Sequence, residues 1–294
     1  MNQQNNYLLK SLILPFLFAS SPSIAMFGPL IKKTVQWHAE KRKHETKLKE
    51  IKQLATVAAV DHEIDTLKNS IYKEGLKEVE HITNKPYDLL KKHFDTERDI
   101  VKDLLQKENP FITQKHSKKI PPAIYNDTIS LLREEKVNPK NITLKYIVST
   151  DPLPQADLLL ADSRGAFFSP HLYPYFKKPR IRMYSTLTNL SILNILFTLR
   201  HELGHVFLQH SSMRRVAADS CNSDDTYNSN IDKLISIQER EANIYAASKN
   251  VQLAYVGMNT QCGDVGHAQI INHEKHCHEM QIAYALMKQK EKLS

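Results

Sequence analysis

The stretch ILFTLRHELGHVFLQH, at residues 195–210, carries the strongest structural signal in the chain. Apolar residues on both sides of HELGH predict a buried helix over about residues 190–210. On such a helix His201 and His205 lie one turn apart on the same face, where two imidazoles can coordinate one zinc ion. Glu202 follows the first histidine and can act as general base on a water molecule at that ion, as in the H-E-x-x-H arrangement. The stretch therefore predicts a hydrolytic zinc site.

A second motif supplies a third ligand for this ion. A catalytic zinc site has three protein ligands and one open position. The sequence QEREAN, residues 238–243, falls on a helix predicted over residues 231–250. Glu239 and Asn243 share a helix face, so Glu239 can bind the ion while Asn243 orients a ligand histidine. Glu241 is rotated about half a turn from Glu239 and is the weaker candidate.

The two motifs, HELGHVFLQH at residues 201–210 and EREANIYAA at residues 239–247, resemble those of the gluzincin metallopeptidases. They are similar to the motifs of two branches, the HtpX/Oma-type peptidases and the ImmA/IrrE-type peptidases. The resemblance covers roughly residues 120–294 and implies that His201, His205 and Glu239 hold one Zn²⁺ ion while Glu202 is the base. Asn243 stands where the first branch commonly has aspartate, which leaves its orienting role less certain.

The resemblance also implies an α+β, zincin-like fold, in which a small twisted sheet lies above the metal-binding helix. An extended polypeptide substrate would add a strand to the edge of this sheet. By position, residues 180–185 are expected to form that edge strand, with Ile181 and Met183 on it. Hydrolysis also needs a group that stabilises the oxyanion. The candidates are histidines near the end of the chain, for which a surface position is an equal alternative: His267, His273, His276 and His278.

The chain divides by composition into three parts. Residues 1–25 are typical of a secretory signal, because one lysine precedes the apolar stretch Leu12 to Ala19 and small residues end at Ala25. An uncleaved anchor is the alternative, although the apolar stretch is short for a bilayer. Residues 31–117 are expected to be a helical N-terminal region, and residues 120–294 a zincin-like metallopeptidase domain. We expect an exported protein, periplasmic or secreted.

The helical pattern is clearest in the N-terminal region. Apolar residues recur at helical spacing from Leu48 to Ile71, and a further helix is expected over residues 86–106. In the second part a helix over residues 122–136 and strands over residues 142–148 and 179–184 are expected, with shorter strands near residues 158–161 and 166–168. Residues 211–230 are predicted to be a polar, turn-rich connection, and residues 273–292 a final helix.

The charge balance limits the partners. The 294 residues include 40 Lys and Arg against 32 Asp and Glu, a net charge of +8, and 41% are hydrophobic. This composition excludes wholesale disorder, collagen and a polytopic membrane protein. Aromatic residues do not alternate with the basic ones, so no nucleic-acid partner is expected. Contact of the basic N-terminal region with a membrane surface or a protein stays open.

Cys221, Cys262 and Cys277 are the three cysteines. Export would permit one disulfide. Cys221 and Cys262 are the favoured pair because both lie in loop-like sequence, although spacing alone does not fix the connectivity.

Together these observations favour an exported zinc-dependent endopeptidase that cleaves polypeptides through a zinc-activated water. One alternative keeps the zinc without proteolysis, as a regulatory or adaptor protein on a zincin fold. The other is a basic helical adaptor that binds membranes or nucleic acid through residues 31–117.

Overall fold

The structure, a computed structural model, describes residues 23–107, 120–147, 161–164, 180–184, 190–221, 224–262 and 273–294. The chain forms two compact units, Met1–Glu50 and Ile51–Ser294. The described residues are mostly helical with one small sheet, which agrees with a mixed α and β composition. Most of the predicted signal segment lies outside the described residues. Among the residues that are described, none of the helices combines the length and apolarity needed to cross a bilayer.

Helix α2 (Ser23–Lys52) accounts for the described part of the first unit and ends just beyond it. From residue 34 to residue 50 its side chains are largely exposed, and the Lys41 ammonium lies 5.3 Å from the ring centre of Trp37. The predicted apolar stripe from Leu48 to Ile71 is not one helix, because the chain leaves the helix after Lys52. Helix α3 (Val57–Thr83) then starts at Thr56, whose side chain accepts a hydrogen bond from the Ala59 amide at 3.1 Å.

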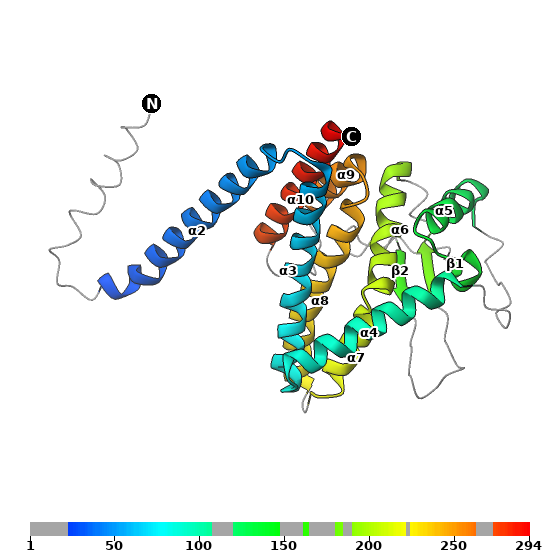
Figure 1. Cartoon of the computed structure of the whole chain (residues 1–294). Coiled ribbons are helices and arrows are strands. Elements are labelled where there is room, and N and C mark those ends of the chain that lie inside the picture. Colours follow the sequence, from blue (N-terminus) through cyan, green and yellow to red (C-terminus); the bar gives the residue numbers. More distant parts are fainter. Residues whose placement is uncertain are drawn as a thin grey trace. The chain divides into compact units, whose positions relative to one another are not determined.

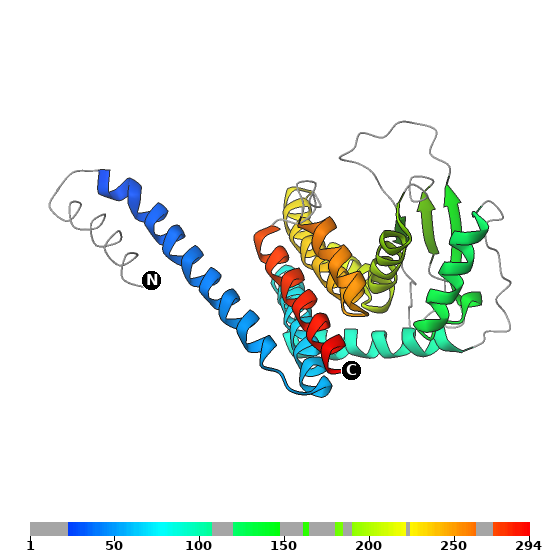
Figure 2. The same ribbon diagram turned by 90° about the horizontal axis from the view of Figure 1, so that it is seen from above.

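In the second unit α3 lies beside α8 (Asp224–Ala247) and α10 (His273–Leu293), with α9 (Val251–Gln261) against α8 and α10 (Figures 1 and 2). Helices α4 (Tyr87–Gln106) and α7 (His210–Ala218) pack with α3 and α8. Their apolar core is formed by Tyr72, Leu76, Val79, Ile82, Leu90, Phe94, Met213, Ala217, Ile231 and Leu234.

The sheet contains β1 (Thr143–Ile147), β2 (Ala161–Arg164) and β3 (Arg180–Tyr184) in the order β1-β3-β2. Strand β3 pairs parallel with β1 and antiparallel with β2. The prediction that residues 180–185 form an edge strand is therefore wrong, because β3 is hydrogen-bonded on both sides. Ile181 and Met183 are buried in the core, at 1% and 0% exposure, and cannot line an open edge. Of the short strand expected near residues 158–161 only Ala161 is described, and it begins β2; the one expected near residues 166–168 lies outside the described residues.

A second core joins the sheet to the helix that carries HELGH. Helices α4, α5 (Pro122–Glu134) and α6 (Ile192–Phe207) contribute apolar side chains to this core together with β1 and β3, and the short 3-10 helix η2 (Pro139–Asn141) contacts α4 and α5. Leu144 and Ile181 from the sheet pack with Leu199 and Leu203 from α6. Since α4 contributes Phe94 to the first core and Leu105 to this one, one helix ties the two cores together.

Two predicted segments differ from the structure in the region around the metal-binding motif. The expected long helix over residues 190–210 ends at Phe207, and α7 starts at His210 after Gln209, which has a left-handed φ of 56°. The connection expected over residues 211–230 instead contains α7 and the first turns of α8, and α9 was not predicted. Helix α7 is rich in polar side chains, which hide its periodicity, and it packs on α3 and α8. Helix α9 packs on α6, α8 and α10.

The cysteines do not pair as predicted. All three are free thiols, so the expected bond between Cys221 and Cys262 is absent. Cys262, at the end of α9, contacts Cys277 on α10, and burial followed by this contact raises the pKa of the Cys262 thiol. The Cys277 sulfur also lies 3.7 Å from His273 Nδ1.

Mild oxidation with oxidised glutathione is therefore expected to join Cys262 to Cys277 and to leave Cys221 free, because only touching thiols meet disulfide geometry. Mass mapping of peptides from the folded protein, with and without reduction, measures the linkage. A bond that includes Cys221 would contradict the arrangement of α9 and α10.

Candidate metal centre

Three side chains from two helices converge at one point. His201 and His205 come from α6 and Glu239 from α8, and all three are buried. The two Nε2 atoms lie 3.0 Å apart. The Glu239 carboxylate lies 3.1 Å from Nε2 of His201 and 3.5 Å from Nε2 of His205. Among the described residues this is the one cluster of three such side chains whose donor atoms all lie within 4.8 Å of one another.

These separations fit a tetrahedral ion. Zinc binds histidine nitrogen and carboxylate oxygen at about 2.0–2.2 Å, so two ligand atoms of a tetrahedral site lie about 3.3 Å apart. The observed 3.0, 3.1 and 3.5 Å bracket that value. The cluster can therefore hold a metal ion with a fourth position left for a small molecule. Nitrogen and carboxylate ligands suit zinc and also other divalent transition metals.

The hydrogen bonds behind the histidines leave both Nε2 atoms available. Nδ1 of His201 lies 2.8 Å from Oδ1 of Asn243, which can only accept, so the ring carries its proton on Nδ1. Asn243 therefore lies behind His201, as its spacing from Glu239 on the helix predicted. Such a contact fixes the tautomer and the orientation of a metal-binding imidazole.

His205 is supported by a partner that the sequence motifs did not reveal. Its Nδ1 lies 2.7 Å from Nδ1 of His210, and Nε2 of His210 lies 3.1 Å from Glu241. Arg98 on α4 in turn lies 3.3 Å from Glu241. His210 was visible in the sequence as the last residue of HELGHVFLQH, but only the break at Gln209 turns its ring toward His205. Glu241, the weaker ligand candidate, therefore binds His210 rather than facing the Nε2 pair.

The electrostatics favour an ionised Glu239 carboxylate and a neutral His205, whereas the pKa of His201 is raised. Burial alone would raise the pKa of Glu239, but His205 and His201 outweigh it and hold that pKa well below its usual range. Burial lowers the pKa of His205. For His201 burial also acts to lower the pKa, but the contacts with Glu239 dominate and raise it. The site thus presents a fixed negative ligand to an incoming cation.

Two further side chains complete the surroundings. Glu202, the candidate base, lies on α6 next to His201 and is buried at 7% exposure. Arg214 on α7 lies 3.3 Å from Glu239 and also donates to Gln238. Sequence analysis missed Arg214 because nothing in residues 211–230 indicated a helix that brings it back to α8.

Of the tail histidines considered for oxyanion stabilisation, His276 is fully buried and its Nε2 lies 3.2 Å from Nδ2 of Asn243. It therefore sits behind Asn243, on the side away from His201. His273 contacts Cys277, and His267 lies outside the described residues.

Gly204, inside the motif, allows α6 and α8 to approach each other. A Cβ at this position would lie 3.1 Å from the Tyr245 ring and 3.3 Å from Cα of Ala242. Tyr245 cannot easily move, because its hydroxyl donates to Glu135 at 2.8 Å. The contact sets the distance between the histidines on α6 and Glu239 on α8.

The change Gly204→Ala is therefore expected to weaken metal binding and to cost up to about 2 kcal/mol of stability, since overpacking of about 1–3 kcal/mol exceeds the helix-propensity gain of about 1 kcal/mol. Zinc affinity and urea unfolding measure both effects. Gly75→Ala in α3 is the matched control, because its Cβ would meet only Ile237 at 3.6 Å. That change is expected to leave metal binding intact and to stabilise the chain slightly. Equal behaviour of the two variants would contradict the close approach.

No family model, no curated protein and no solved structure matches the chain. The resemblance to gluzincins thus stays a prediction from the two motifs.

Proposed function

We propose that the protein is a zinc-dependent peptidase of zincin-like architecture. The observation that carries the proposal is the convergence of the His201, His205 and Glu239 donor atoms within 4.8 Å, with Glu202 adjacent on the same helix. A zinc ion held there would supply activated water at neutral pH, because it lowers the pKa of bound water to about 7. A site that is only structural has no use for a base beside it.

Each residue of the site would have a separate role in the reaction. Glu202 would accept the proton of the attacking water and pass it to the leaving amine, as a general base and then acid. Asn243 and His210 hold the two ligand rings in the tautomer that exposes Nε2. Glu239 contributes the negative charge that balances a divalent ion.

The sheet suggests where an extended substrate would bind. Among the described strands β2 lies at the edge of the sheet; it runs antiparallel to β3 and lies beside α6 (Figure 1). An unpaired strand edge can accept a further strand from a peptide. We therefore transfer the substrate-binding role that was predicted for residues 180–185 to β2, Ala161–Arg164.

Metal content of the purified full-length chain tests the proposal. We expect about one zinc per chain, cleavage of a fluorogenic peptide library that stops with a chelator and returns with zinc, and loss of bound zinc in His205→Ala. The exposed His81→Ala variant is the control and should keep its zinc. Zinc binding without cleavage of any peptide would support the non-proteolytic alternative, and absence of metal binding would overturn both. Export and contact of the basic helix α2 with a membrane or protein remain predictions.

A further inference from the structure

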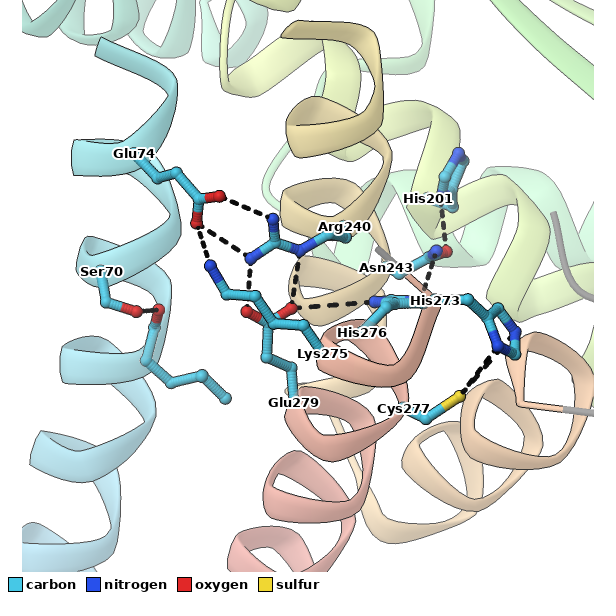
Figure 3. Close-up of polar contacts among 11 residues, drawn as sticks. Ser70, Glu74, His201, Arg240, Asn243, His273, Lys275, His276, Cys277 and Glu279 are labelled. Carbon is cyan, nitrogen blue, oxygen red and sulfur yellow. Dashed lines mark hydrogen bonds and ion pairs between the residues drawn. The ribbon is translucent and has the colours of Figure 1, made fainter. Parts of the chain in front are cut away.

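A buried amide lies between two histidines from different helices. Asn243 on α8 has its Oδ1 2.8 Å from Nδ1 of His201 and its Nδ2 3.2 Å from Nε2 of His276, the fourth residue of α10 (Figure 3). Asn243 and His276 are both fully buried. An amide accepts with its oxygen and donates with its nitrogen, so the direction in which it faces decides what each histidine must do.

The direction of this amide controls the ligand His201. In the observed orientation Nδ1–H of His201 donates to Oδ1, so Nε2, 3.1 Å from the Glu239 carboxylate, is the nitrogen that can bind a metal ion in place of a proton. A reversed amide would present its NH₂ group to Nδ1. His201 would then have to accept at Nδ1 and carry its proton on Nε2, the atom that must be bare to bind a metal.

His276 selects the observed direction. Its Nε2 accepts from the amide NH₂ of Asn243, which requires a ring with one proton, on Nδ1. Burial lowers the pKa of His276 although Glu279 opposes this, so the ring is neutral. Nδ1 has no hydrogen-bond partner among the described residues, but it lies 3.9 Å from the Glu279 carboxylate, whose negative charge favours a proton on Nδ1. Arg240 holds that carboxylate with an Nε–Oε2 distance of 2.9 Å (Figure 3). A reversed amide would face Nε2 with a second acceptor.

We propose that His276 is a positioning residue of the metal centre: it orients the amide of Asn243 and thereby sets the metal-binding tautomer of His201. The inference rests on the proposed function, because it assumes that His201 is a metal ligand. It assigns a role to α10, more than thirty residues beyond the last ligand in the sequence.

A double-mutant cycle tests the inference through zinc affinity, measured by competition with a chromophoric chelator. In the wild-type background His276→Ala is expected to weaken zinc binding about 10–100-fold, the usual loss for a residue that supports a ligand. In the Asn243→Asp variant the side chain is a carboxylate, which accepts hydrogen bonds with both oxygens and therefore needs no partner to orient it. In the Asn243→Asp background the same change is therefore expected to alter affinity by no more than about twofold. His276→Gln, which keeps an acceptor oxygen, should retain most of the wild-type affinity.

The outcomes are distinguishable. Equal losses from His276→Ala in both backgrounds would mean that the ring only fills space, and this would overturn the inference. If the wild type binds zinc and His276→Ala binds it with the same affinity, the inference about His276 is overturned and the proposed function is not. A wild type that binds no zinc would overturn the proposed function and the inference with it.

A measurement on the wild type keeps the test independent of how the variants fold. Nitrogen-15 NMR of the metal-free chain is expected to show the His276 and His201 rings protonated on Nδ1. A His276 ring with its proton on Nε2 would overturn the inference, because Nε2 could not then accept from Asn243.

Discussion

Replacing Glu202 with glutamine is expected to leave zinc bound and to lower peptide hydrolysis about 10²–10⁴-fold, the usual contribution of a general base. Glutamine has the same shape but cannot take up a proton. The three proposed ligands, His201, His205 and Glu239, are not altered. Zinc content and the rate of cleavage under saturating zinc measure the two effects separately.

The control for this change is Glu45→Gln, which removes a carboxylate from the exposed face of α2. It should affect neither zinc content nor the rate. Cleavage at the wild-type rate by Glu202→Gln would refute the assigned role of Glu202, whereas loss of zinc from this variant would show that Glu202 helps to hold the ion.

Replacing Arg240 with alanine is expected to lower the free energy of unfolding by about 3–5 kcal/mol, because it leaves a buried carboxylate without its partner. The Arg240 side chain is 3% exposed and donates to Glu279 on α10 and to Glu74 on α3 (Figure 3). Its two contacts to Glu74 are both 3.0 Å long. The guanidinium thus joins three helices, and urea unfolding at pH 7 measures its contribution.

A second variant separates charge from packing. Replacing both Arg240 and Glu279 with methionine removes the buried pair together, which costs far less than removal of one partner. A double variant as unstable as Arg240→Ala would contradict the electrostatic explanation.

Lowering the pH should remove the contribution that the ionised Glu74 side chain makes to the free energy of unfolding. Burial alone would raise the pKa of Glu74, but hydrogen bonds from Arg240 and Lys275 outweigh it and lower the pKa to about 2 from its ordinary 4.5. Because the pKa is lower in the folded state, the contribution is complete above about pH 4.5 and is lost as the pH falls toward 2. Since Glu74 is about a third exposed, the loss should be modest. In Arg240→Ala the unfolding free energy should change less with pH over this range.

Local patterns predicted much of the secondary structure. The break at residues 84–86, the helix that became α4 and the final helix were all predicted within a few residues. Their signals are local: Asn84 adopts a left-handed φ of 54°, and prolines precede α4 and begin α5. Helix α7 has no side-chain cap and was missed, and α9 was missed although the side chain of Asn250 caps its first turn.

The sequence by itself predicted which side chains form the cluster that could hold a metal ion. The spacing of His201 and His205 places both on one helix face, and the spacing of Glu239 and Asn243 does the same on α8, because helical periodicity is a local property. Tertiary structure decided the rest. It placed β3 in the middle of the sheet, turned His210 toward His205 and brought His276 behind Asn243. These contacts join elements far apart in the chain, and they depend on which buried surfaces fit each other, which no local spacing encodes.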